Sequence, residues 1–243
     1  MDALNLALFL TAAFLGGFTS GLSGFAMGLV VSGIWLHIVA PDQNALLIVL
    51  CGLVTQGSGI WRVRRAIEWR KLAPFIAGGL LGVPAGTVLL KAADPETVRL
   101  CIGILLMAFS LYSLIRPAIA LPPAGIAGEF GVGVANGLIS GLTGLGGIAV
   151  TIWSQLRGGG KDAQRAIFQP VMFATFAMTA VALGVAGAYT METLKLYALA
   201  LPTLIAGVWT GIRLYGKIDD TTFRRIVLSL LILSGLSLIV TIR

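Results

Sequence analysis

Two short segments, rich in glycine and in hydroxyl-bearing residues, are the part of this sequence best suited to bind a ligand. The first reads GFTSGLSG over residues 17–24, and the second reads GLISGLTGLGG over residues 137–147, 120 positions further along the chain. Glycine destabilises a helix by about 1 kcal/mol relative to alanine, and serine and threonine hydroxyls compete for backbone hydrogen bonds. Because both segments lie within apolar stretches, we predict that each one interrupts a membrane-embedded helix.

An interruption of this kind favours the binding of a small anion. A helix that restarts after a break presents unpaired N–H groups and a partial positive charge, and glycine lets an anion approach the backbone closely. Irregular backbone at membrane depth is tolerated where it is buried in protein or lines a water-filled cavity, and matched breaks in two halves point to a transporter's binding site. The predicted substrate-binding residues are Ser20, Gly21, Ser23, Gly24, Ser140, Gly141, Thr143, Gly144, Gln56 and Thr175.

Close helix packing is an alternative explanation for these glycines, since small residues four positions apart let helices approach each other in a bilayer. Two motifs at matching positions, each with hydroxyl groups, favour a binding site over packing. Other polar residues in the apolar runs fit a site or an interhelical hydrogen bond; they are Thr55, Ser58, Asn136, Gln155, Gln169 and Thr179.

The predicted site contains no fixed charge, because no Asp, Glu, Lys or Arg lies in the middle of an apolar run. It would offer hydrogen-bond donors and helix dipoles only, which suits an anion that must bind and leave again. We therefore expect anion movement driven by the membrane potential, without obligatory proton or sodium coupling. His37 lies beside Trp35 near a predicted helix end, which favours an interfacial residue over a proton relay.

Composition identifies an integral membrane protein. Hydrophobic residues make up 57% of the chain and charged residues 11%, against about 25% charged residues in soluble domains. The net charge of +7 comes from basic residues in short loops, where the positive-inside rule accounts for them without nucleic-acid binding. Cys51 and Cys101 lie in apolar runs, so we predict no disulfide, no metal site and no cofactor. No set of catalytic residues is present, which argues against an enzyme.

The elements that must position the glycine segments are long apolar runs. Residues 4–40 and 126–156 are each too long for one span of about 20 residues, so we predict a broken helical hairpin in each. Whether these hairpins are re-entrant or consist of two complete short spans stays open. The remaining predicted spans cover residues 45–61, 72–90, 100–115, 166–188, 196–212 and 226–242. The prediction is therefore an all-α membrane domain with a first repeat at 1–119 and a second repeat at 120–243.

Charge in the loops predicts that the second repeat is inverted. Asp42 and Asp162 match at a spacing of 120, and the segment 82–86 matches 207–211 at a spacing of 125. Five Lys and Arg residues lie at 62–71, whereas the matching loop around Glu192 and Lys195 contains one. Loops rich in Lys and Arg face the cytoplasm. Because a basic loop in one half matches a loop with few basic residues in the other, matching loops are predicted to face opposite sides of the membrane. Both termini then face outward.

The paired glycine segments resemble the hallmark of the TauE/SafE sulfite exporter family, also called the toluene-sulfonate uptake permease family. The resemblance covers the whole chain and implies two similar halves and transport of sulfite, sulfoacetate or another organic anion across the bacterial inner membrane. The partners it implies are a small anionic substrate and the lipid bilayer, with a homodimer left open. The first copy departs from the family pattern at Gly24-Phe25-Ala26-Met27, where more glycine is usual, so Phe25 and Met27 are expected to narrow the site.

The sequence thus predicts a helical transporter that exports an organosulfonate or sulfite bound between two helix breaks. A membrane scaffold or assembly factor without transport activity is the alternative. Matched helix breaks near the midplane favour the transporter, because a scaffold has no need of them.

Overall fold

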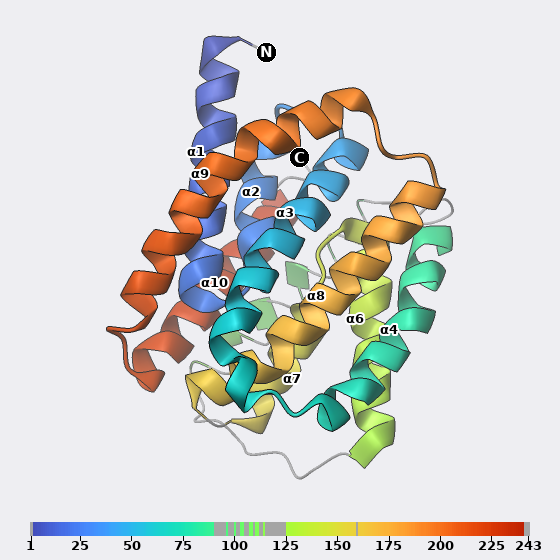
Figure 1. Ribbon diagram of the computed structural model, residues 1–243, viewed down its shortest axis with the longest axis vertical. Coiled ribbons are helices and arrows are strands. Elements are labelled where there is room, and N and C mark those ends of the chain that lie inside the picture. The colour runs from blue at the N-terminus through green and yellow to red at the C-terminus, as the bar shows by residue number, and fades with distance from the viewer. Residues whose placement is uncertain are drawn as a thin grey trace.

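The chain folds into a bundle of helices (Figure 1). The computed structural model describes residues 2–89, 125–158 and 160–240, and the single positions 96, 100, 103, 104, 107, 108, 110, 111 and 114. The elements are α1 (Ala3–Ser23), α2 (Met27–Trp35), α3 (Pro41–Val63), the 3-10 turn η1 (Arg64–Ala66), α4 (Trp69–Leu89), α6 (Gly125–Thr143), α7 (Ile148–Arg157), α8 (Lys161–Val185), α9 (Met191–Tyr215) and α10 (Asp220–Val240). The predicted all-α class is confirmed, with no strand among the described residues; half of the positions in the predicted span 100–115, among them Cys101, lie outside them.

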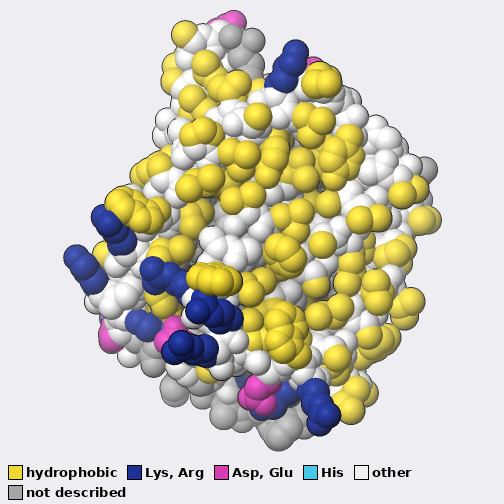
Figure 2. Space-filling view, viewed as in Figure 1, with side chains coloured by type: hydrophobic (Ala, Val, Ile, Leu, Met, Phe, Trp, Pro, Cys, Tyr) yellow, Lys and Arg dark blue, Asp and Glu magenta, His cyan; other side chains and the backbone are white. Residues whose placement is uncertain are grey.

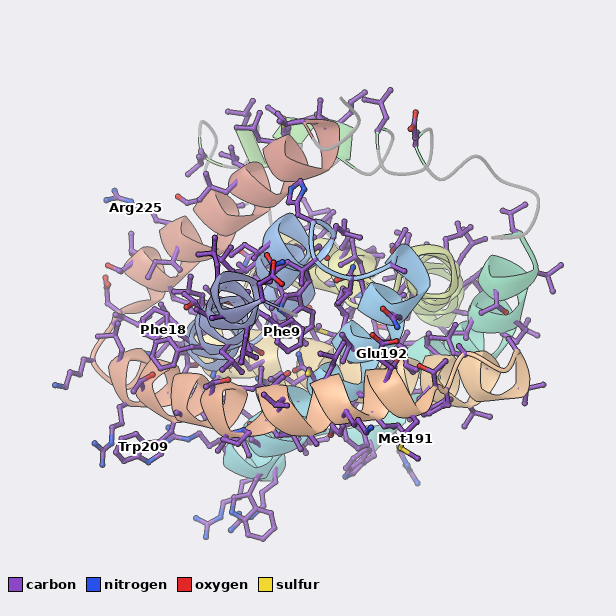
Figure 3. The ribbon with its side chains drawn as sticks, turned by 90° about the horizontal axis from the view of Figure 1, so that it is seen from above. Phe9, Phe18, Met191, Glu192, Trp209 and Arg225 are labelled. Atoms are coloured by element: carbon purple, nitrogen blue, oxygen red, sulfur yellow. The ribbon has the colours of Figure 1, made fainter. Side chains whose placement is uncertain are left out.

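The exterior of the bundle is apolar. Within the part of the chain that the structure describes, five helices are long and apolar enough to cross a membrane, namely Ala3–Ser23, Gln43–Ala66, Trp69–Leu89, Lys161–Val185 and Met191–Tyr215. Large side chains such as those of Leu80, Val185 and Trp209 are exposed, and Figure 2 shows hydrophobic side chains spread over the face in view. In Figure 3, Trp209 points away from the bundle. This surface is suited to lipid rather than water, so the protein is a multi-pass membrane protein.

Two helical hairpins are broken inside the bundle. The chain leaves α1 at Gly24 and restarts as α2 at Met27; it leaves α6 at Gly144 and restarts as α7 at Ile148. The restarted helices have 9 and 10 residues, a length of about 15 Å at most, which is half of a hydrocarbon core. In Figure 1 the α1–α2 pair opens toward the upper end of the molecule and the α6–α7 pair toward the lower end.

The breaks lie a few residues later than the sequence suggested. The segments 17–24 and 137–147 were each predicted to interrupt a helix, but α1 and α6 continue as regular helix to Ser23 and Thr143. Each of these helices persists for two reasons. The hydroxyl of its last residue, Ser23 or Thr143, bonds to a backbone carbonyl one turn earlier. The glycines that precede this residue pack against a neighbouring helix. In the first segment only Gly24 leaves the helical conformation, whereas in the second Gly144, Gly146 and Gly147 do so.

Those earlier glycines bring pairs of helices into backbone contact. The most extensive pairings are α1 with α9 and α4 with α6. A Cβ atom at Gly207 of α9 would lie 2.1 Å from the carbonyl oxygen of Phe14, and one at Gly82 of α4 would lie 2.2 Å from that of Val134. Only glycine allows such approach, so each broken hairpin is held against a long helix from the other half of the chain.

Helix α8 begins earlier than predicted, and this matters for the site. Its first residue is Lys161, preceded by Gly160 in an extended conformation, whereas the sequence interpretation placed residues 157–165 in a loop. Three ionisable side chains, those of Lys161, Asp162 and Arg165, therefore belong to the helix. They are accommodated because they bond to α1 and to the end of α9.

Candidate functional site

A small cavity lies between the two helix breaks and the helices α3 and α8. Its lining consists of Phe25, Ala26, Met27, Gly28, Leu29, Ile48, Gly52, Thr55, Gln56, Leu145, Gly146, Gly147, Ile148, Met172 and Phe176. The segments 25–28 and 145–148 match at the spacing of 120 found in the sequence. Segments far apart in the chain thus meet at one place.

The first residues of both restarted helices face this cavity. Met27 and Gly28 open α2, and Ile148 opens α7. The first N–H groups of a helix have no partner within that helix, and they carry the positive end of its dipole. The cavity therefore lies where two helix N-termini can act on an anion.

Gln56 is the one residue of the predicted site that lines the cavity. It is 1% exposed, and its Oε1 has no hydrogen-bond partner among the described residues. A buried polar atom without a partner is costly, and a carboxamide can present either its oxygen or its NH₂ group to a ligand. Gln56 thus presents a buried carboxamide with an unpartnered atom at the cavity.

None of the described residues that line the cavity has an ionisable side chain. Some of the lining amides are already bonded, such as that of Met27 to the carbonyl of Phe25 and that of Gly147 to Asn136. What the cavity can offer a ligand is the other backbone amides in the first turns of α2 and α7, the Thr55 hydroxyl and the Gln56 carboxamide. Among the described residues, no group of three or more His, Cys, Asp and Glu side chains could hold a metal ion.

At about 20 Å³ the cavity has room for little more than one water molecule. The bulky side chains around it are those of Phe25, Met27, Met172 and Phe176, and these must move before an anion can enter. Methionine is well suited to such movement, because its side chain is unbranched and has three rotatable bonds. In this conformation the cavity is therefore too small to hold such an anion. Phe25 and Met27, which we expected to narrow the site, both line this cavity; their effect on a bound substrate stays a prediction.

Ser23 and Thr143 shape the breaks with their hydroxyl groups. Ser23 Oγ donates to the carbonyl of Thr19 at 2.7 Å and accepts from the amide of Phe25 at 3.4 Å. Thr143 Oγ1 likewise donates to the carbonyl four residues earlier at 2.7 Å and accepts from the amide of Leu145 at 3.1 Å. Both hydroxyls thus bond to the backbone of their own break.

Gly24 and Gly144 make the sharp turns that end α1 and α6. Their φ angles are +86° and +72°, a region that side chains with a Cβ rarely adopt. Their amides donate to the carbonyls of Ser20 at 2.7 Å and of Ser140 at 2.8 Å, as in an αL helix cap. Ser20 itself is buried in the last turn of α1.

Polar side chains of α6 and α8 form a network behind the second break. Ser140 Oγ and Thr179 Oγ1 are 2.9 Å apart, and Asn136 Nδ2 donates to Thr175 Oγ1 at 3.1 Å. Asn136 Oδ1 accepts from the amide of Gly147 at 2.9 Å. Ser140 and Thr175 therefore bond within this network and do not line the cavity.

Gly21 and Gly141 are packing residues in this conformation. A Cβ atom at Gly21 would lie 2.4 Å from the carbonyl oxygen of Val208, and one at Gly141 would lie 2.5 Å from that of Val83. The alternative explanation by close helix packing accounts for these two contacts.

A buried cation near the site contradicts the expectation that no fixed charge lies there. Arg165 of α8 is 1% exposed, and its Nη2 donates at 2.8 Å to the carbonyl oxygens of Gly21 and of Leu22. Its guanidinium lies over the ring of Tyr215, 3.8 Å from the centroid. The sequence interpretation missed it because Arg165 was assigned to the preceding loop. The available signal was Ala166, where the apolar run begins directly after Arg165.

Comparisons with known proteins agree on one family. The family model described as sulfite exporter TauE/SafE matches residues 9–238. A protein of Cupriavidus necator named "probable sulfite/organosulfonate exporter TauE" is 25% identical over 229 residues, which cover 92% of this chain and 89% of that protein. No solved structure matches the chain.

Proposed function

Since this chain belongs to the sulfite exporter TauE/SafE family, we propose that it exports sulfite or an organosulfonate across the bacterial inner membrane. The family model and the Cupriavidus relative both carry the description of an exporter. The observation that supports a site for this function is the cavity lined by the N-termini of α2 and α7 together with Gln56. The anion would bind in that cavity.

The groups around the cavity suit a sulfonate or sulfite oxygen. Amides at the start of α2 and α7 donate toward negative charge, and each helix N-terminus contributes about half a positive elementary charge. The Gln56 carboxamide can add a hydrogen bond. Charge-assisted bonds of this kind hold an anion in a site that excludes water, while the uncharged lining allows it to leave again.

We propose that the two halves, 1–119 and 120–243, are inverted repeats. Gly207 meets the backbone of Phe14 just as Gly82 meets that of Val134, and these contacts agree with the spacings of 125 and 120 in the sequence. The hairpin of each half packs on the third long helix of the other half. Rocking one half against the other would then open the cavity to either side.

The distribution of basic residues supports a cytoplasmic location for the lower end of the molecule as drawn in Figure 1. In Figure 2 most Lys and Arg side chains in view gather toward that end of the molecule. The turn η1, the start of α8 and the turn between α9 and α10 also lie toward that end in Figure 1. By the positive-inside rule this end faces the cytoplasm and the opening between α1 and α2 faces outward.

The test is anion flux in proteoliposomes that contain the purified protein. Sulfite and sulfoacetate should enter saturably and compete with each other, whereas empty liposomes should show no such flux. A Gly28→Leu variant should lose transport, because a Cβ there already lies 2.8 Å from Ile48 Cγ2 and a larger side chain would fill the cavity. The matched control is Gly57→Leu on α3, where a Cβ meets no atom closer than 3.6 Å. Absence of flux from the folded wild-type protein would favour the scaffold alternative.

A further inference from the structure

Arg165 is buried against the first helix break without contributing to the cavity lining. Its guanidinium holds the carbonyls of Gly21 and Leu22 and lies over the ring of Tyr215. Its Nε has no hydrogen-bond partner among the described residues, and it lies 3.0 Å from where a Cβ of Gly24 would be. The cation therefore lies directly behind the glycine at which α1 ends.

The position of Arg165 offsets an electrostatic effect of the first break that disfavours anion binding. Each break brings the carbonyl end of one helix next to the amide end of another, and the carbonyl end carries partial negative charge that repels an anion. Gly21 and Leu22 supply two of the carbonyls at that end. Because Arg165 binds both, it offsets the repulsion at the point where α1 stops.

The matching position at the second break carries no charge. The position 120 residues before Arg165 is Ala45, and the Cα of Ala45 lies 3.1 Å from where a Cβ of Gly144 would be. A small residue thus packs where the first break has a cation. The two breaks beside the cavity therefore differ in charge: a cation lies behind Gly24, and an uncharged residue lies behind Gly144.

Neighbouring ionisable groups reduce this charge without cancelling it. Asp162 Oδ1 accepts from the hydroxyl of Tyr215 at 2.6 Å, and Lys161 Nζ bonds to the carbonyls of Tyr215 and Ile218. Among the described residues, no carboxylate lies within ion-pair distance of Arg165. Arg62 lies near Arg165 and Asp219 near Lys161, so three cations and two anions among the described residues leave this corner with a net positive charge. Burying an arginine without a carboxylate partner is costly, which favours a functional reason for its presence.

We propose that Arg165 is a positioning residue that fixes the first break and, through its charge, makes the site prefer doubly charged anions to singly charged ones. The inference rests on the proposed function, since it concerns the same cavity. Arg165 acts through its neighbours: Phe168, on the same helix, packs edge-on against Phe25 of the cavity lining, with 6.3 Å between ring centres. The charge of Arg165, which lies beside Gly24, acts on the nearby cavity because the protein interior screens charge less than water does.

The experiment compares two anions of similar size in binding to the purified protein. Sulfoacetate carries two negative charges at neutral pH, and 2-hydroxyethanesulfonate carries one. Arg165→Met removes the charge and keeps a long side chain to cover Tyr215. We expect this variant to bind the monoanion about tenfold more weakly and the dianion about a hundredfold more weakly, because the lost interaction scales with the charge of the ligand.

Control variants separate charge from structure. Arg165→Lys keeps the charge and loses the planar stack, so its preference for the dianion should equal that of the wild type even where its thermal stability falls. Arg157→Met removes a part-buried cation that is paired with Glu129 at 3.3 Å, and the ratio of the two affinities should stay unchanged.

Equal losses for both anions in Arg165→Met, or no loss, would overturn the inference while the proposed function stands. If Arg165→Met does not fold, a changed affinity ratio in Arg165→Lys would overturn it, and an unchanged ratio would support it. A folded wild-type protein that binds neither anion would instead refute the proposed function.

Discussion

The side-chain oxygen of Asn136 accepts a hydrogen bond of 2.9 Å from the amide of Gly147, which ties the middle of α6 to the residue just before α7. The same side chain donates to Thr175 on α8, and it is fully buried. Asn136 therefore fixes the second break from behind. The matching position in the first half is Gly16, which has no side chain to do the same.

Replacing Asn136 with alanine should destabilise the protein by about 1–3 kcal/mol, because the buried amide of Gly147 loses its acceptor. Thermal unfolding in detergent measures this change. The matched control is Asn44→Ala, since Asn44 is also buried but its amide makes a single long bond of 3.4 Å to Ser32. Equal losses in stability for the two variants would contradict the role assigned to Asn136.

Gly141→Ala should destabilise the protein by about 1–3 kcal/mol, as overpacking does in a tight core. The added Cβ would lie 2.5 Å from the carbonyl oxygen of Val83, so α4 and α6 would have to separate. On the same helix, Gly131 has nothing within 4 Å of an added Cβ. Gly131→Ala should therefore stabilise α6 by about 0.5–1 kcal/mol. A thermal melt that ranks the two variants the other way round would refute the packing role of Gly141.

Gln56→Leu should weaken anion binding about tenfold, the loss of one hydrogen bond to a charged ligand. Gln56→Glu should weaken it further, because a carboxylate would repel the anion. Gln169→Leu is the matched control: Gln169 is also buried with an unpartnered Oε1 among the described residues, but it does not line the cavity. Titration of sulfoacetate into the three folded variants tests the assignment, which fails if Gln56→Leu and Gln169→Leu bind equally well.

The sequence was sufficient to predict where the helices break, because the signal is local. Runs of glycine with serine or threonine inside apolar stretches are poor helix formers, and Gly24 and Gly144 do turn the chain. The prediction was a few residues early because helix ends also depend on packing. Gly21 and Gly141 stay helical against Val208 and Val83, contacts that a single sequence does not reveal.

Long-range contacts explain why the site could be predicted only in part. Gln56 was selected as a polar residue in an apolar run, and it lines the cavity. Substrate contact by the serine, threonine and glycine residues of the motifs stays a prediction. Arg165 was missed because its partners Gly21 and Leu22 lie more than 140 positions away in the sequence, so nothing local distinguished it from a loop cation.

Residues 65 and 195 should face opposite sides of the membrane. Arg65 is exposed in η1 and Lys195 is exposed near the start of α9, toward opposite ends of the bundle in Figure 1. Single cysteines at these positions, introduced after removal of Cys51 and Cys101, should react with an impermeant maleimide from the cytoplasm and from outside, respectively. Labelling of both positions from one side would refute the proposed inversion of the repeats.

Transport should respond to membrane potential and should persist without a proton or sodium gradient. The cavity lining contains no ionisable side chain that could carry a compensating proton, and Arg165 is held on backbone carbonyls. Moving one charge across the membrane is worth about 2.3 kcal/mol per 100 mV, and a factor of ten in concentration needs about 1.4 kcal/mol. A cell interior that is negative would therefore lower the inside concentration of a monovalent anion more than tenfold below the outside concentration.

In proteoliposomes with a potential clamped by potassium and valinomycin, anion uptake should rise when the interior is made positive. Flux that ignores the voltage and follows an imposed pH gradient would show that a proton moves with the anion.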